Sequence, residues 1–321
     1  MKLGVLTVPL YHMSPEEAFK YLSGLGVQTV EIGVGGFVGN THLNPREFLA
    51  DPGKVSAYKE LLAKYNLEIS ALSAHANPVH PNKETAAKAH EDFIDACKIA
   101  QKFGLDTVVT FSGCPGDQPG AKYPNWVTCP WPDDFLEILK YQWNDVLVPY
   151  WKNAAREAAA YGVTKIALEL HPGFCVYSTK TLLHLREEVG DAIGANFDPS
   201  HLFWQGMNPV EAIRSMQGAI YHFHAKDTKV NARNVEVNGV LDTDHYGKIL
   251  DRSWIFRTVG YGHDYAVWKD IISTLRAVGY EGAISIEHED GQMSVKEGLE
   301  SAIKFLKNVI LFEKPADMWW A

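Results

Sequence analysis

The chain has 321 residues, of which 46% are hydrophobic and 21% are charged. These fractions are typical of a folded globular protein with a large core, arranged as one large domain or two ordinary ones. The formal net charge is -9 and no run of Lys or Arg is longer than a pair, which argues against binding to nucleic acid or to an anionic membrane. A small-molecule partner is therefore favoured.

The apolar stretch at the N-terminus is interrupted early, by His12 and Pro15. It is too short for a signal peptide or a membrane span, and no later segment is long enough. The four cysteines form no CxxC pair and are widely spaced, at Cys97, Cys114, Cys129 and Cys175. This pattern predicts a reduced, cytoplasmic protein.

In chain order, short apolar runs rich in β-branched residues alternate with segments of helical period. Eight runs predict strands, at 2–8, 27–34, 67–76, 106–113, 165–172, 193–201, 219–227 and 282–290. Helices are predicted at 14–26, 83–104, 134–161, 179–189, 208–216, 264–279 and 294–312. Local signals support two of these ends: Ser14 is an N-cap before an acidic first turn, and Gly104 closes the second helix.

Apolar strands joined by helices predict a parallel sheet covered on both faces, and eight such units predict a single (β/α)8 TIM barrel of the α/β class. The barrel is expected to span 1–312, followed by a C-terminal tail at 313–321 whose two tryptophans fold back or pack on a neighbour. No GxGxxG follows the first strand, which argues against a dinucleotide-binding sheet. Long βα loops at 35–52, 114–133 and 228–265 are expected to cover the C-terminal face, where barrel enzymes build active sites.

An ionisable residue stands at the end of each of the last four strands: Glu169, Asp198, His224 and Glu287. Any one of them could be a solvated group, a helix cap or a hydrogen-bonded core residue. Together at one partly buried rim, the three carboxylates would repel one another unless a cation neutralised them. The four residues are therefore predicted to bind a divalent metal, which could be Mn²⁺, Mg²⁺, Co²⁺ or Zn²⁺, with the harder ions favoured.

Residues near the same rim are candidate substrate contacts. Substrate binding is predicted for His75, His201, Trp204, Lys226 and Arg257, and Glu31, Asn77 and Ser112 are further candidates. For His201 a hydrogen bond that stabilises its loop is an equal alternative. His222 lies on the same face of its strand as His224 and is interpreted as a deeper residue that supports the site.

Four motifs resemble those of one family: ALELHP, NFDPSH, HFHAKD and SIEHED, in this order and at strand ends. They resemble the xylose isomerase-like superfamily of TIM barrels, and the resemblance covers the whole chain. It implies that Glu169, Asp198, His224 and Glu287 are the metal ligands, and that Glu169 and Glu287 are also the catalytic acid/base pair. The motifs do not distinguish between substrates.

The resemblance and the paired carboxylates predict a divalent-metal-dependent sugar isomerase or epimerase. A metal that chelates a carbonyl and the adjacent hydroxyl of a ketose or related polyol ketone acidifies the C–H bond between them, so a glutamate can remove the proton and leave a metal-stabilised enediolate. Mn²⁺ is the expected cofactor, a carbohydrate is the expected substrate, and a homo-oligomer is the expected assembly.

Three alternatives remain. If the enediolate expels a substituent, the enzyme is a dehydratase or lyase, similar to inosose dehydratases or to the large subunit of C-glycoside deglycosidases, which act on 3-oxo-glycosides with a small accessory subunit. A DNA repair nuclease of the endonuclease IV type is disfavoured by Ser112, where that family has a histidine, and by the acidic net charge. The acid/base glutamates argue against a non-enzymatic sugar-binding barrel.

Overall fold

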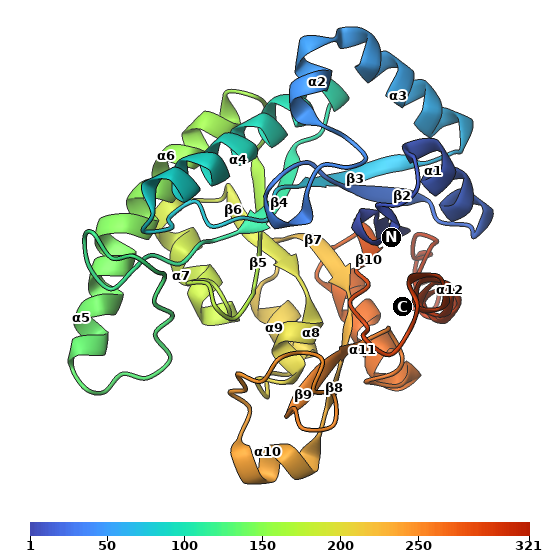
Figure 1. The fold of residues 1–321 in the computed structure, drawn as a ribbon. Helices are drawn as coiled ribbons and strands as arrows, with labels where there is room; N and C mark the ends of the chain where they lie inside the picture. Colours follow the sequence, from blue (N-terminus) through green and yellow to red (C-terminus); the bar gives the residue numbers. More distant parts are fainter.

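The computed structural model describes all 321 residues and contains a closed barrel of eight parallel strands (Figure 1). The strand order is β1-β10-β7-β6-β5-β4-β3-β2, and Lys2 paired with Ala283 closes the ring. The strands are β1 (Lys2–Leu6), β2 (Thr29–Gly33), β3 (Glu68–Ser73), β4 (Thr107–Phe111), β5 (Lys165–Glu169), β6 (Ile193–Phe197), β7 (Ile220–Ala225) and β10 (Ala283–Ile286). Each lies within a predicted strand range, so the prediction of a single TIM barrel is confirmed.

Helices surround the barrel (Figure 1), and their ends follow local chemistry. Ser14 and Glu17 exchange side-chain and backbone hydrogen bonds in a capping box that begins α1. Gly104, at φ 74°, ends α4 in the left-handed conformation that glycine favours. No helix is both long enough and apolar enough to cross a membrane. The main helices are α1 (Pro15–Gly24), α3 (Pro52–Lys64), α4 (Lys83–Phe103), α6 (Val148–Ala159), α7 (Thr179–Val189), α9 (Pro209–Ser215), α11 (Tyr265–Ala277) and α12 (Val295–Leu306).

Several helical elements were not predicted. The helix α3 was missed because only Val55, Tyr58 and Leu62 of its thirteen residues are buried, which leaves a weak apolar period. The predicted helix at 134–161 is divided by a π-helical segment, η3. The other unpredicted elements are too short for a periodic pattern. These unpredicted elements are η1 (Val8–Leu10), η2 (Gly36–Val38), α2 (Pro45–Ala50) and α8 (Pro199–Phe203). The predicted range 134–161 contains α5 (Asp134–Lys140), η3 (Tyr141–Leu147) and α6.

The main apolar core lies between the strands and the helices and contains 62 buried residues in one contiguous cluster. Ala71, Val109 and Ala167, on β3, β4 and β5, form a separate small cluster. Trp151 on α6 and Trp268 on α11 are the largest fully buried side chains, and full burial of a large apolar side chain stabilises the fold by on the order of 3 kcal/mol. Trp151 Nε1 also donates to the Ser112 carbonyl at 2.9 Å, which ties α6 to the end of β4.

The connection at 228–265 carries its own two-stranded antiparallel sheet, which the sequence did not predict. The strands β8 (Asp227–Val230) and β9 (Trp254–Arg257) pair, and α10 (Ala232–Asn238) lies between them along the chain. These elements project from one side of the barrel (Figure 1). Strands of four residues are too short to show a clear alternation of apolar and polar residues.

Asp227 anchors this insertion to the barrel. Its buried carboxylate accepts hydrogen bonds of 2.7–3.2 Å from the backbone N–H groups of Gly260, Gly262 and His263, from His263 Nδ1 and from Trp268 Nε1. Hydrogen bonds to a charged group each contribute about 1.5–3 kcal/mol. This one side chain therefore holds the start of β8 against the segment that returns to α11.

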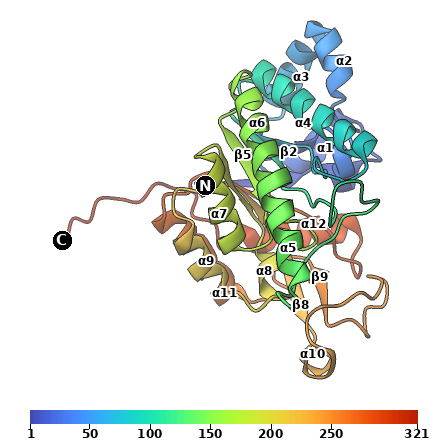
Figure 2. The same ribbon diagram turned by 90° about the vertical axis from the view of Figure 1, so that its left-hand side faces the viewer.

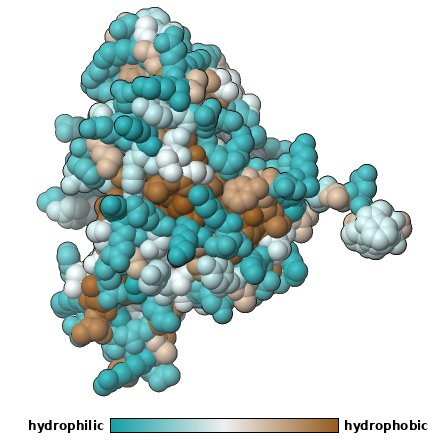
Figure 3. Space-filling view, turned by 90° about the vertical axis from the view of Figure 1, so that its right-hand side faces the viewer, coloured by the Kyte–Doolittle hydropathy of each residue, from teal (hydrophilic) through white to brown (hydrophobic).

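The tail at 313–321 has no helix or strand. Trp319 and Trp320 are 87% and 68% exposed, and Figures 2 and 3 show the tail standing off the barrel from two opposite sides. The expectation that the tail folds back is therefore wrong, because the tryptophans contact each other and not the barrel. Packing of the tail on a neighbouring molecule stays a prediction.

Replacing Asp227 by Ala should lower the free energy of unfolding by at least about 3 kcal/mol, because several buried donors lose their acceptor. Urea denaturation followed by circular dichroism measures the effect. Asp251→Ala removes an exposed carboxylate of the same insertion and should change the stability by less than about 0.5 kcal/mol. Equal stabilities of the two variants would contradict the anchoring role of Asp227.

Candidate active site

The ends of four adjacent strands bring the predicted metal ligands together. Glu169 is the last residue of β5, Asp198 follows β6, His224 lies near the end of β7, and Glu287 follows β10. One ligand atom of each residue lies within 4.8 Å of the others. All four side chains are buried except Glu287, which is 13% exposed.

His224 is oriented by a carboxylate behind it. Its Nε2 donates to both oxygens of Glu31, at 3.0 Å each, so its Nδ1 faces the other ligands. Nδ1 lies 3.3 Å from Glu169 Oε2 and 3.3 Å from Glu287 Oε2, but it has no hydrogen-bond partner. A carboxylate that accepts the second N–H of a histidine is the usual support of a metal-binding imidazole.

Lys226 supplies a positive charge beside the carboxylates. Its Nζ donates to Glu287, and to Glu289 Oε2 at 2.9 Å, and it lies 3.1 Å from Asp198 Oδ2. Asp198 Oδ2 accepts no hydrogen bond of good geometry, whereas Oδ1 caps α8 by accepting from Ser200 N–H at 2.8 Å. Burial raises the pKa of Asp198 to about 7, despite the ammonium nearby.

Glu169 is held by three donors. Its Oε2 accepts from His75 Nε2 at 3.0 Å and from Asn196 Nδ2 at 3.1 Å, and its Oε1 accepts from His201 Nε2 at 3.0 Å. Asn196 Oδ1 in turn accepts from His222 Nδ1 at 3.1 Å. His222 is fully buried, as expected of a residue that supports the site from below.

The charges of this cluster depend on one another. Burial acts to raise the pKa of Glu287, but the Lys226 ammonium and the His224 imidazole outweigh it and hold the pKa at about 2. Burial also acts against the ionised form of Glu169, yet its contacts with the imidazoles of His201, His224 and His75 lower its pKa well below the usual value. Burial disfavours the charged form of His224, but the carboxylates of Glu31 and Glu287 raise its pKa well above the usual value. The carboxylates thus require positive charge among them.

This donor set fits a divalent metal. It offers three carboxylates and one imidazole nitrogen, and two of its buried atoms, Asp198 Oδ2 and His224 Nδ1, have no hydrogen-bond partner. Unpaired buried polar atoms are costly, and a cation bound to both would satisfy them. Mixed oxygen and imidazole donors suit several divalent ions.

The structure places the five predicted substrate contacts in two groups. His75, His201 and Lys226 contact the ligand residues directly. The other two make different contacts: Arg257 Nε donates to Asp290 Oδ2 at 2.9 Å, and the Trp204 indole stacks on Trp254 at 4.5 Å between centroids.

Glu31 makes different contacts from those that the sequence suggested. It was a candidate substrate contact, but its side chain is fully buried and bonded to His224, Ser73 and Ser285. Its position in the middle of β2, with only small or apolar neighbours in the strand, is the signal that could have indicated a buried acceptor. Phe256 was also missed; its ring lies 4.6 Å from Lys226 Nζ.

A cavity of about 400 Å³ opens beside the metal-ligand cluster. Glu287, His75 and Glu289 line one part of it, and aromatic side chains line another. Among these, Phe111 and Phe174 stack at 4.3 Å between centroids. A cavity of this size with apolar walls and a few polar groups is typical of a small-molecule site.

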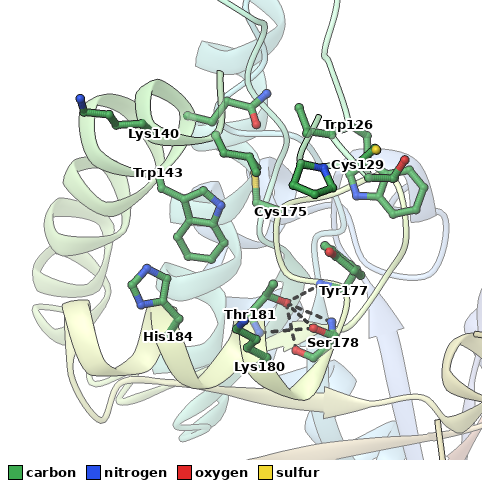
Figure 4. Close-up of a pocket in the computed structure, with 15 residues that line it drawn as sticks. Trp126, Cys129, Lys140, Trp143, Cys175, Tyr177, Ser178, Lys180, Thr181 and His184 are labelled. Carbon is green, nitrogen blue, oxygen red and sulfur yellow. Dashed lines mark hydrogen bonds between the residues drawn. The ribbon is translucent and has the colours of Figure 1, made fainter. Parts of the chain in front are cut away.

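A second pocket, of about 460 Å³, lies between the loop at 114–133, α5 and α7 (Figure 4). Trp126, Trp143, Tyr177 and His184 are among its lining residues, and none of the lining residues is a carboxylate. It therefore offers no pair of carboxylates for acid/base catalysis. The candidate active site is the metal-ligand cluster at the barrel rim.

Comparison with known proteins establishes the family. Residues 19–309 match the family model of the xylose isomerase-like TIM barrel, so the chain belongs to that family and the resemblance of its four motifs is confirmed. The uncharacterised protein YfiH of Bacillus subtilis is 38% identical over 313 residues, which cover 97% of this chain and 99% of YfiH.

Two further comparisons concern a named enzyme and a solved structure with a bound metal. An inosose dehydratase of Clostridium botulinum is 27% identical over 257 residues, which cover 79% of this chain and 79% of that protein. The solved structure of the IolI protein with a bound zinc atom has a TM-score of 0.67 and 18% identity, and covers 97% of this chain and 98% of that chain. At 18% identity, the comparison with IolI shows similarity of fold alone.

Glu31→Gln should weaken the binding of a divalent metal by about 10–100-fold, because the carboxylate that orients His224 loses its charge. Titration calorimetry with Mn²⁺ measures the dissociation constant. Glu68→Gln, at the exposed start of β3, is the matched control and should bind Mn²⁺ as the wild type does. A wild-type dissociation constant in Glu31→Gln would show that Glu31 does not support the metal site.

Proposed function

We propose that this protein is a divalent-metal-dependent isomerase or epimerase that removes a proton next to the carbonyl group of a sugar or related polyol ketone. The observation that carries this proposal is the pairing of two glutamates, Glu169 and Glu287, with Asp198 and His224 in a single donor set beside a cavity. A metal bound to this set would polarise the substrate carbonyl and acidify the neighbouring C–H bond.

Glu287 is the better placed of the two glutamates to take the first proton. It is the ligand residue that lines the cavity, and its low pKa keeps it ionised at neutral pH. Lys226 and the position of Glu287 at the end of β10 hold the carboxylate at the cavity wall. Proton transfer by a positioned carboxylate is the usual first step toward an enediolate.

Glu169 serves the other face of the substrate. His75 and His201 hold its two oxygens, so the orientation of the carboxylate is fixed. Burial and the nearby positive charges lower the pKa of His201 to about 3, which keeps this ring neutral. Return of the proton to the opposite face of the same carbon gives epimerisation, and return to the adjacent carbon gives isomerisation.

A dehydratase is the second candidate, supported by the 27% identity to an inosose dehydratase. In this reaction Glu287 takes the proton from the carbon next to the carbonyl, and the electron pair forms a carbon–carbon double bond. The carbon–oxygen bond one carbon further on breaks, and the hydroxyl leaves as water with a proton from the Lys226 ammonium. Lys226 would then act as the general acid.

Mn²⁺ is the proposed cofactor, because three of the four donors are carboxylates and favour harder ions. Zn²⁺ is the first competitor, since the related fold of IolI holds a zinc atom. The homo-oligomer and the cytoplasmic location stay predictions from the sequence.

Glu287→Gln should slow exchange of the substrate proton with solvent deuterium by roughly 10²–10⁴-fold. A screen of ketoses, inososes and 3-oxo-glycosides in D₂O, followed by NMR, measures the exchange in the metal-loaded protein. Glu281→Gln, at the opposite end of the same strand, is the matched control and should exchange at the wild-type rate. Normal exchange in Glu287→Gln would remove this residue from the mechanism, and no exchange in any wild-type reaction would contradict the enediolate proposal.

A further inference from the structure

Two of the four cysteines, Cys114 and Cys175, lie on segments that are adjacent in space. Cys114 is in the loop after β4 and Cys175 is in the loop after β5, and these two strands pair in the barrel. Beyond the strands, the Cys175 N–H donates to the Gly113 carbonyl at 2.9 Å. Backbone segments joined by such bonds lie about 5 Å apart, and the Cα atoms of a disulfide are usually about 4.4–6.8 Å apart. The backbone spacing therefore permits a disulfide between Cys114 and Cys175.

The two thiols interact directly. Both side chains are buried, and neither cysteine is in a disulfide. Contact with the Cys175 thiol lowers the pKa of Cys114, whereas the same contact and burial raise the pKa of Cys175. A thiol with a lowered pKa has a larger fraction of thiolate, which is the nucleophile in disulfide formation. Cys114 is therefore the better nucleophile of the two.

Neighbouring groups hold both cysteines in place. Asn77 Nδ2 donates to the Cys114 carbonyl at 2.9 Å, and Asn77 Oδ1 accepts from the Cys114 N–H at 3.0 Å. In the other loop, the Val176 N–H donates to Ser112 Oγ at 2.9 Å. Because both segments are fixed next to each other, a bond between the sulfurs needs no large movement of the backbone.

Small molecules can reach Cys175 through the pocket of about 460 Å³ between the loop at 114–133, α5 and α7, because Cys175 is one of its lining residues (Figure 4). Cys129 lines the same pocket and is exposed, but its sulfur donates to the Trp131 carbonyl at 3.3 Å. Cys97 is fully buried in the main core. Cys175 is thus the cysteine that both faces a pocket and has a second thiol beside it.

We propose that Cys114 and Cys175 are a redox modification site and form a reversible disulfide when the protein meets hydrogen peroxide. The Cys175 sulfur attacks one peroxide oxygen; an S–O bond forms, the O–O bond breaks, and the leaving hydroxide takes the thiol proton and becomes water. The Cys114 sulfur then attacks the Cys175 sulfenic acid; the S–S bond forms, the S–O bond breaks, and a second water leaves with the Cys114 proton. Two thiols and one peroxide give one disulfide and two waters, and a dithiol reductant reverses the reaction.

The disulfide joins two loops close to the candidate active site. Phe174, directly before Cys175, stacks on Phe111 in the wall of the cavity beside the metal-ligand cluster. Oxidation therefore restrains the segment that carries Phe174. None of the proposed metal ligands takes part, so the inference does not depend on the proposed function.

Peptide mapping of the native, full-length protein tests the proposal. The protein is treated with hydrogen peroxide, the remaining thiols are blocked with iodoacetamide, and the digest is analysed by mass spectrometry with and without reduction. A cross-linked peptide containing Cys114 and Cys175 should appear, and the number of free thiols should fall from four to two. Dithiothreitol should restore all four thiols. Cys129→Ser is the matched control and should form the same cross-link.

Cys114→Ala and Cys175→Ala should each abolish the cross-linked peptide, and the wild-type map decides the question even if one of these variants does not fold. Oxidation of Cys129 alone, a cross-link that includes Cys129, or four free thiols after treatment would each overturn the proposal. A Cys114–Cys175 cross-link that forms in urea but not in the native protein would overturn it as well.

Discussion

The hydrogen bond from His224 Nε2 to Glu31 is the contact on which the geometry of the site depends. An imidazole has two ring nitrogens, and because this bond occupies Nε2, Nδ1 is the nitrogen that faces the carboxylates. Ser73 and Ser285 donate to Glu31 from the neighbouring strands β3 and β10. Three strands therefore fix the orientation of one ring, at a depth where water does not compete.

The barrel separates the proposed metal ligands from most of the residues that line the adjoining cavities. The proposed ligands stand at the ends of buried strands, where the backbone is rigid. The walls of the cavity beside the ligands, and of a further cavity that shares His171 and Glu289 with it, come largely from loops and from the insertion that Asp227 anchors. Loops at the C-terminal face of a barrel can change without disturbing the strands.

Sequence reasoning could predict the parts of the structure that follow from local periodicity. All eight barrel strands and the convergence of Glu169, Asp198, His224 and Glu287 follow from apolar runs and from the rule that parallel strands end at one rim. The partner of Glu31 could not be predicted, because His224 is 193 residues away in the chain. The hairpin of β8 and β9 was also missed, because its pairing depends on contacts between segments that are short and separated by α10. The tail was predicted as a segment, but no local pattern could say where its tryptophans lie.

A crystal structure with Mn²⁺ bound, with the ion located by its anomalous scattering, tests the central claim most directly. A single peak should lie about 2.0–2.2 Å from His224 Nδ1 and from one oxygen each of Glu169, Asp198 and Glu287. His224 Nε2 should still donate to Glu31. A peak between Glu31, His222 and His224, which are also close enough to share an ion, or coordination through His224 Nε2 would contradict the proposed site.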